Sequence, residues 1–283
     1  MRKINTDKII RNLKNNGYAI LQNHFDEKTC NSIIILLNKI LKKNHNRKKI
    51  ISLSRNQVTI NDLIFRDIKK FLKFVDIPIV LDVAKKTFQD DFILDNFIAS
   101  NSVKFNQSLN ERNKKKSIAH MDGHLPITEF NNTTDLVIII CLNEFNKNNG
   151  ATRIWPKSHL SGIRINHSKL NKNIEKKYKI LEAKFGSIIF LLGQTWHQIR
   201  SNLSSDERWG LIIHYKRWWL KPSLDYTKCG KKIFNSLNFN QKKLFGFTSI
   251  SPKFDFKLKC RKNYKTKRDI INLPKNYKDA TNY

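Results

Sequence analysis

The hydrophobic residues in the first third of the chain recur at helical spacing. Residues 7–14 are predicted to form a helix, and residues 18–21 have the composition of a short strand. Asp26 can cap a second helix, and a further apolar stripe precedes Pro78. Each of these two helical stripes places its apolar residues on one face: Ile33, Leu36, Leu37, Ile40 and Leu41, then Ile64, Ile68, Phe71, Leu72 and Val75. A shorter helix over residues 80–88 completes a mainly helical support, residues 1–90.

From about Phe92 the pattern changes to short β-rich runs separated by turn residues. The predicted strands are residues 97–109, 136–142, 151–155, 187–192 and 209–217. Asn149-Gly150, between two of these runs, indicates a hairpin, because both residues tolerate the positive φ of a tight turn. Many short strands without alternating βαβ units favour an antiparallel sandwich or barrel flanked by helices.

No linker divides the chain, so we expect one domain over residues 1–262. Its core would be residues 91–220, followed by a C-terminal helical extension, residues 221–262, with a helix within 225–246 packed on the barrel. Residues 263–283 are rich in Lys and Asn and poor in apolar residues, which predicts a basic, loosely ordered tail.

Composition adds a large positive charge to this picture. The 283 residues are 40% hydrophobic, enough for a real core, and 54 Lys+Arg against 23 Asp+Glu give a net charge of +31. Such an excess favours an anionic partner. However, the lysines are scattered as pairs along the whole chain, which is typical of a solvated basic surface. We therefore expect no specific nucleic acid partner.

Neither a membrane segment nor a disulfide framework is predicted. The longest apolar run, residues 136–142, is far shorter than the roughly 20 residues that span a bilayer. Residues 1–16 are too polar for a signal peptide. The four cysteines lie far apart without a CxxC pair, so reduced thiols in a cytoplasmic protein are expected.

The first segment with chemical content is Ala119-His120-Met121-Asp122-Gly123-His124. On an extended strand, side chains at i and i+2 face the same way, so His120 and Asp122 can reach one point. An imidazole and a carboxylate suit a first-row transition metal, and a third ligand would complete the facial triad of non-heme iron(II) oxygenases. Alone, a His-x-Asp pair also fits an ordinary surface turn.

A second segment supplies the missing ligand. A Gly-led apolar run, residues 185–196, delivers His197 at its end, and Arg208 follows eleven positions later on the next predicted strand. If these strands are neighbours, the Arg208 guanidinium lies deeper in the pocket than the metal. A fixed cation there can pair bidentately with the far carboxylate of a dicarboxylate whose keto-acid end chelates iron.

With these residues in place, the chain resembles the phytanoyl-CoA dioxygenase family of iron(II)- and 2-oxoglutarate-dependent oxygenases. The likeness covers roughly residues 10–220 and is carried by three stretches: His120-Met121-Asp122; Asn149-Gly150-Ala151-Thr152-Arg153-Ile154-Trp155-Pro156-Lys157-Ser158-His159; and His197 with Asn202, Ser204 and Arg208. The opening Asn16-Gly17-Tyr18-Ala19-Ile20 is similar too. The resemblance implies a mainly β fold with flanking helices, the double-stranded β-helix of jelly-roll or cupin-like barrels.

The resemblance also implies an activity and a site. His120, Asp122 and His197 would be the catalytic residues that bind iron(II), and Arg208 would anchor 2-oxoglutarate. A C–H bond of a small-molecule or carrier-linked substrate, favoured to be anionic by the basic surface, would be hydroxylated with release of succinate and CO2. Relatives that chlorinate their substrates lack the carboxylate ligand, so Asp122 argues against that chemistry.

Two positions depart from the family pattern. The family's turn usually reads Pro-Gly-Ser-His, and Lys157 replaces the Gly. A small hydroxyl residue often stands two positions after the distal His and contacts 2-oxoglutarate, whereas this chain has Ile199. Gln107 or Asn106, on a strand leading toward the metal pair, is the candidate for that cosubstrate contact.

The remaining polar candidates have simpler interpretations. His124 shares the phase of His120 and Asp122, but only one further ligand is needed, so a hydrogen-bonding or substrate-side role is favoured. His159 is expected to be a structural turn residue. Asn202 and Ser204 should organise the turn before Arg208, since short polar side chains bond locally to backbone. Trp196 is by default a core or rim aromatic, notable because it precedes His197.

Two rival functions remain open from the sequence. A non-catalytic basic β-barrel that binds nucleic acid or another polyanion would explain the charge, but it needs no register between His197 and Arg208. A metal hydrolase on a cupin-like barrel would use the metal ligands without a buried Arg.

Overall fold

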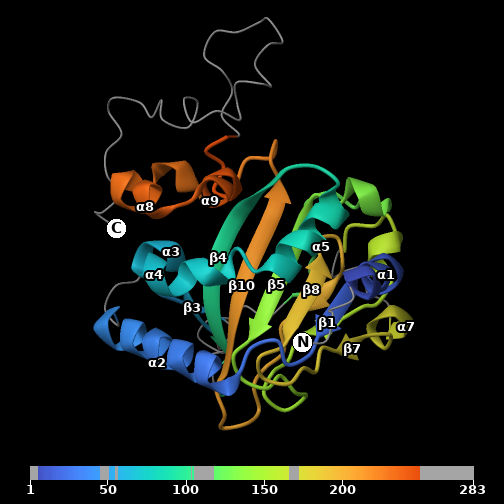
Figure 1. Ribbon diagram of the computed structural model, residues 1–283. Coiled ribbons are helices and arrows are strands. Elements are labelled where there is room, and N and C mark those ends of the chain that lie inside the picture. Colours follow the sequence, from blue (N-terminus) through green and yellow to red (C-terminus); the bar gives the residue numbers. More distant parts are fainter. Residues whose placement is uncertain are drawn as a thin grey trace, which may run out of the picture.

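Two antiparallel sheets form the centre of the molecule (Figure 1). The computed structural model describes residues 6–44, 51–54, 57–102, 104, 118–165 and 172–248. The larger sheet has the strand order β1-β8-β5-β10-β4-β3-β2 and the smaller one β7-β6-β9. The strands are β1 Tyr18–Leu21, β2 Ile51–Ser54, β3 Gln57–Ile60, β4 Phe92–Ser102, β5 Asp135–Cys141, β6 Arg153–Ile154, β7 Lys179–Ile180, β8 Ile188–Leu192, β9 His197–Gln198 and β10 Arg208–Arg217.

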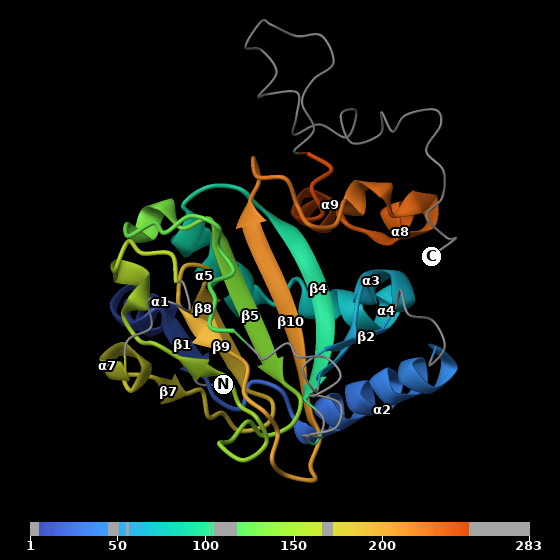
Figure 2. The same ribbon diagram turned by 180° about the vertical axis from the view of Figure 1, so that it is seen from behind.

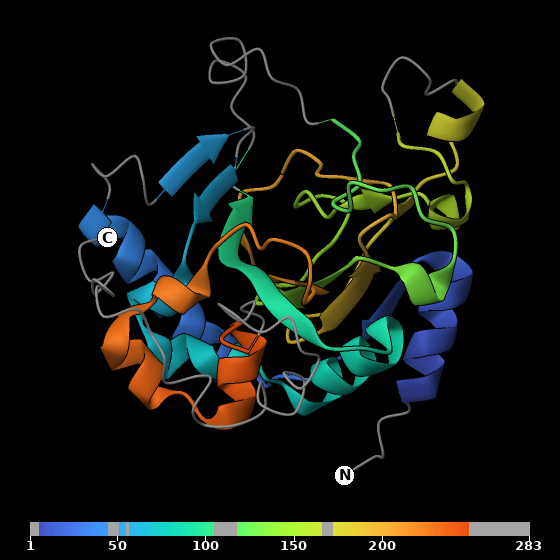
Figure 3. The same ribbon diagram turned by 90° about the horizontal axis from the view of Figure 1, so that it is seen from above.

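Helices cover one face of the larger sheet, and the smaller sheet with its loops covers the other (Figures 1, 2 and 3). The helices are α1 Thr6–Asn16, α2 Glu27–Asn44, α3 Leu63–Arg66, α4 Ile68–Phe71, α5 Pro78–Phe88, α7 Lys172–Glu175, α8 Gly230–Ser236 and α9 Phe239–Leu244. Short 3-10 turns are η1 Leu72–Phe74, η2 Phe130–Asn132, η3 Ser158–Leu160 and η5 Tyr226–Lys228. No helix within the described ranges has both the length and the apolar character that a bilayer crossing requires.

The expected mainly β, cupin-like fold with flanking helices is confirmed. Among the described strands, no ladder of hydrogen bonds joins the larger sheet to the smaller one, so the barrel is not closed. The arrangement is a sandwich whose interior lies between the sheets. β10 runs through the middle of the larger sheet, paired with β4 on one side and β5 on the other.

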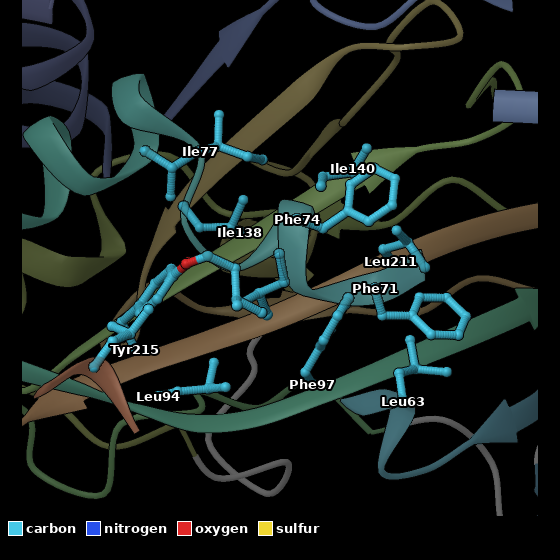
Figure 4. Packing of buried hydrophobic residues seen from close by; sticks show 14 of the residues in the cluster. Leu63, Phe71, Phe74, Ile77, Leu94, Phe97, Ile138, Ile140, Leu211 and Tyr215 are labelled. Atoms are coloured by element: carbon cyan, nitrogen blue, oxygen red, sulfur yellow. The ribbon is translucent and has the colours of Figure 1, made fainter. Parts of the chain in front are cut away.

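Side chains of β10 alternate between two environments. Trp209, Leu211, Ile213 and Tyr215 point into the large apolar core under the helices, where Figure 4 shows Tyr215 and Leu211 among aromatic and aliphatic neighbours. The Tyr215 hydroxyl donates to the carbonyl of Val75 at 2.7 Å. The opposite phase faces the space between the sheets: Arg208, Gly210, Ile212, His214 and Lys216. Because the strand period is two, burying the first set fixes the direction of the second.

The predicted helices are largely confirmed, with one break. The Asp26 carboxylate accepts from the backbone N–H of Thr29 at 2.6 Å, so it caps α2 as expected. The stripe over residues 64–75 is not one helix, because Asp67 adopts an extended conformation (φ −159°) and caps α4 through the N–H of Lys70. A side chain that bonds its own downstream backbone competes with helix continuation.

Two predictions in the β-rich part of the chain need correction, and one strand pair was missed. Asn149-Gly150 forms a turn, with φ +83° at Gly150, but not the hairpin that we expected, because β5 and β6 belong to different sheets. The Asn149 amide instead bonds within its own loop, to Asn146 and Glu144. The predicted strand 97–109 begins earlier, at Phe92, and most of residues 103–109 lie outside the described part of the chain. The β2–β3 pair was not predicted.

The C-terminal extension packs at one end of the larger sheet as two short helices rather than one (Figure 1). α9 begins with a complete capping box, in which Asn238 and Gln241 each bond the other's backbone N–H, and this explains the separate start of the second helix. The division into a domain and a basic tail stays a prediction, since residues 249–283 lie outside the described part.

A buried ionic cluster ties this extension to the sheet. Lys216 Nζ lies 2.9 Å from Asp95 Oδ1 and 3.9 Å from Asp135 Oδ1, and all three side chains are largely buried. Asp95 sits where the β4–β10 register shifts, and its other oxygen accepts from the hydroxyl of Ser223 at 3.0 Å. One carboxylate thus holds two strands and the segment leading to η5.

Asp95→Ala should lower the free energy of unfolding by about 3–5 kcal/mol, the usual cost of removing one partner of a buried ion pair. Urea denaturation measures this change. Asp82→Ala is the matched control, because its pair with Lys86 is 4.0 Å long and solvent-exposed, and such pairs contribute about 0–1 kcal/mol. Equal effects of the two substitutions would contradict the structural role of Asp95.

Candidate metal centre

His120, Asp122 and His197 meet at one point between the two sheets. His120 and His197 form an isolated antiparallel bridge, in which each backbone N–H donates to the other residue's carbonyl at 2.9 and 2.8 Å. Their ring centroids are 4.3 Å apart. The Asp122 carboxylate lies between them, 3.7 Å from His120 Nε2 and 3.5 Å from His197 Nε2. One ligand atom from each residue falls within 4.8 Å of the others, a spacing that one metal ion can bridge.

Both imidazoles are oriented by the backbone in the same way. His120 Nδ1 is 2.9 Å from the carbonyl of Ile118, and His197 Nδ1 is 3.0 Å from the carbonyl of Thr195. A protonated Nδ1 donating to these carbonyls leaves each Nε2 unprotonated and turned toward Asp122. Metal-bound histidines usually donate their other N–H in this manner, which fixes the tautomer and the ring orientation.

The Asp122 carboxylate is electrostatically suited to a cation. Burial acts to raise its pKa, but the histidines around it outweigh burial, and the pKa lies below its ordinary value. The carboxylate is therefore ionised at neutral pH. Deprotonated ligands are what metal binding requires.

Arg208 is a buried cation at the start of β10. Its side chain is only 5% exposed, its guanidinium lies 4.5 Å from the centre of the Phe145 ring, and its Nε has no hydrogen-bond partner. No acidic residue in the described ranges forms an ion pair with it. Burial lowers the pKa of Arg208 to about 10, so the group is still charged at neutral pH. A buried charge without a partner is costly, so this site fits an anionic ligand.

The expected turn before Arg208 is present. Asn202 Oδ1 accepts from both the N–H and the hydroxyl of Ser204, and Asn202 Nδ2 donates to the carbonyl of Ser102 at 2.8 Å. The N–H of Arg208 donates to Asn101 Oδ1 at 3.1 Å. These side chains fix the point at which β10 enters the sheet and thereby aim Arg208 inward.

Other residues singled out in the sequence have different places. His124 is exposed and lies outside the metal-ligand group. His159 is buried with Nε2 2.9 Å from the carbonyl of Lys14, a structural contact as expected. Lys157 adopts φ +67°, the left-handed conformation that explains why a Gly is usual there. Gln107 and Asn106 lie outside the described residues, so the second 2-oxoglutarate contact expected from them stays a prediction.

His214 is a site residue that the sequence reasoning missed. It is in the same phase of β10 as Arg208, and its positive potential contributes to the lowered pKa of Asp122. Counting every second residue from Arg208 would have identified it. The sequence alone does not show which strands neighbour this one, so His214 was not predicted to face Asp122.

Comparison with known proteins identifies the family of the chain. The model of the phytanoyl-CoA dioxygenase (PhyH) family matches residues 13–210. The chain belongs to the phytanoyl-CoA dioxygenase family. Iron(II) and 2-oxoglutarate, the cofactors expected from the sequence, are those of this family, and the three converging side chains have the chemistry to hold the iron.

Individual relatives are more distant. A protein from Aspergillus fumigatus named dioxygenase af480 is 26% identical over 175 residues, which are 61% of this chain and 53% of that protein. The match thus spans about half the length of that curated relative. Two structures of SnoN, a non-heme α-ketoglutarate-dependent epimerase from nogalamycin biosynthesis, share the fold. TM-scores are 0.59 and 0.60 at 14% and 12% identity, covering 77% of this chain and 84% and 86% of those chains.

Asp122→Ala should weaken Mn²⁺ binding by more than about 100-fold, because losing even an outer partner of a metal ligand costs roughly 10- to 100-fold. His124→Ala is the matched control: it removes an imidazole two positions further along the same segment and should change the affinity less than about threefold. Titration calorimetry of the metal-free protein gives both values. An equal loss in the two variants would contradict the assignment of the three ligands.

Proposed function

We propose that this member of the phytanoyl-CoA dioxygenase family is an iron(II)- and 2-oxoglutarate-dependent dioxygenase. It hydroxylates a C–H bond of a small-molecule or carrier-linked substrate and releases succinate and CO2. His120, Asp122 and His197 bind the iron, and Arg208 binds the distal carboxylate of 2-oxoglutarate. The observation that carries the proposal is the buried guanidinium of Arg208, which forms no ion pair with any acidic residue in the described ranges.

Other cations on the same strand make this observation sharper. Lys216 pairs with Asp95 and Asp135, and Arg217 Nε donates to the carbonyl of Thr133 at 2.8 Å. The protein thus supplies acceptors for two of the cations that β10 buries. For Arg208 the described residues supply the aromatic face of Phe145 and no carboxylate. A dicarboxylic cosubstrate provides that anion in the bidentate geometry that a guanidinium prefers.

The side chains divide the work of the reaction. His120, Asp122 and His197 would hold the iron and leave it coordination positions that the protein does not fill. Iron(II) and 2-oxoglutarate, when bound there, would supply the oxidising power that inserts one oxygen atom of O2 into the substrate C–H bond, with 2-oxoglutarate converted to succinate and CO2. The protein would hold the two ends of 2-oxoglutarate at a fixed separation, one near the metal ligands and the other at Arg208. It would also exclude water with apolar walls. These walls include Phe145, Val137 and Ile139.

Hydroxylation, the substrate and the location are part of the proposal. The structural neighbour is an epimerase, and one fold can host different reactions. The complete Asp122-containing ligand set supports oxygen transfer rather than halide chemistry. The basic chain favours an anionic substrate. Among the described cysteines, Cys30, Cys141 and Cys229 are free and buried, which supports the expected reducing, cytoplasmic setting.

Asp122→Ala should abolish succinate formation from 2-oxoglutarate under air, because it removes one of the ligands that retain the iron. The wild type should release succinate slowly even without substrate. Quantifying succinate by chromatography with added iron(II) and ascorbate gives the result, and His124→Ala should retain the wild-type rate. Succinate production that persists in Asp122→Ala would show that the carboxylate ligand is misassigned.

Arg208→Gln should weaken 2-oxoglutarate binding by roughly 30-fold to several thousand-fold, since losing a buried, hydrogen-bonded charge partner costs about 2–5 kcal/mol. Mn²⁺ affinity should stay within about threefold, because Arg208 touches none of the metal ligands. Calorimetric titration of each ligand separates the two effects. An unchanged 2-oxoglutarate affinity would reduce Arg208 to a structural role.

A further inference from the structure

The Arg208 end of the site contains two more polar side chains than the proposed function has used. In the strand register, Arg208 of β10 is directly opposite Ser102 of β4, and Ser102 is directly opposite Gln57 of β3. Residues opposite each other in antiparallel strands place their side chains on the same face of the sheet. Gln57, Ser102 and Arg208 therefore form a row across three strands on the face toward the smaller sheet.

This row is buried and chemically incomplete. Ser102 is 1% exposed and Gln57 8%, yet within the described part of the chain neither the Ser102 hydroxyl nor the Gln57 amide has a hydrogen-bond partner. Buried polar side chains are nearly always hydrogen-bonded in native proteins. Three neighbouring buried side chains, one of them a cation, whose donors meet no acceptor among the described residues, are the lining expected around a bound anion.

The backbone holds the row in place. Asn202 Nδ2 donates to the Ser102 carbonyl, and Asn101 Oδ1 accepts from the Arg208 N–H, so both strands are fixed at this level. Gly150, with φ +83°, brings its backbone close to this wall: a Cβ there would lie 2.9 Å from Ser102 Oγ. The Ser102 hydroxyl thus lies between the backbone of Gly150 on one side and strand β10, which carries Arg208, on the other.

We infer that Ser102 and Gln57 complete the binding site for the distal carboxylate of 2-oxoglutarate beside Arg208. This inference rests on the proposed function. A carboxylate has about four acceptor sites, and a bidentate guanidinium uses two. The hydroxyl of Ser102 and the amide NH2 of Gln57 donate to the others. In this inference they replace Gln107 or Asn106 as the second contact to 2-oxoglutarate, which a hydroxyl residue usually makes where this chain has Ile199.

The test is titration calorimetry of anaerobic, Mn²⁺-loaded protein with two ligands. 2-Oxoglutarate has the distal carboxylate, whereas 2-oxopentanoate keeps the keto-acid end and the carbon chain but lacks that group. Ser102→Ala and Gln57→Leu should each weaken 2-oxoglutarate binding by about 10- to 150-fold, the usual effect of losing a hydrogen bond to a charged group. Affinity for 2-oxopentanoate should change less than about twofold.

Ser100→Ala is the matched control variant. Ser100 lies on the same strand and the same face and is also buried, but it is opposite Gly210 instead of Arg208. Its substitution should leave both affinities at the wild-type value. Comparison of melting temperatures identifies any variant that does not fold, and the 2-oxopentanoate titration shows that the metal end of the site is intact in those that do.

The outcomes separate this inference from the function on which it rests. If wild type binds 2-oxoglutarate and only Arg208→Gln loses it, the inference is overturned while the proposed function stands. A loss of 2-oxopentanoate binding equal to that of 2-oxoglutarate also overturns it, because the damage is then not at the distal carboxylate. If wild type binds no 2-oxoglutarate, both fail together.

Discussion

Two backbone hydrogen bonds between His120 and His197 are the constraint on which the site depends. They pair residues 77 positions apart as an antiparallel bridge and set the two imidazoles side by side. Asp122, two residues beyond His120, then falls within reach of both rings. Backbone pairing thus builds the centre, and the side chains add the chemistry. The carbonyls of Ile118 and Thr195 orient the rings in turn, so the ligands depend on regular main-chain geometry rather than on flexible contacts.

β10 connects stability with function. The side chains of β10 that face the helices, which include Trp209 and Tyr215, are buried in the large core. Their burial prevents the strand from shifting its register by one residue. The side chains of β10 that face the space between the sheets include Arg208, at one end of the candidate site, and His214, which lies toward Asp122. A shift of one residue would exchange the two sets. The packing of the core is therefore what keeps the guanidinium directed at the space between the sheets.

Charge has two separate meanings in this molecule. The net charge of +31 comes from lysines spread along the sequence and is a property of the chain as a whole. The informative charges are the few that are buried, because burial forces each one to have a partner. Lys216 pairs with two carboxylates of the protein, whereas Arg208 forms no ion pair with any residue that the structure describes. This difference, rather than the total charge, supports the proposal that an anion binds at Arg208.

The sequence by itself determined the ligand types, their order and most of the elements around them. His120 and Asp122 were readable because a strand's period of two is local, and His197 and Arg208 because each stands at the boundary of an apolar run. Only the tertiary structure decided what is adjacent across strands. It separated β5 from β6 despite Asn149-Gly150, added β2 and β3, and set Ser102 and Gln57 in line with Arg208 across three strands. Which strands pair depends on how the side chains of whole sheets are buried, and a local sequence pattern does not contain that information.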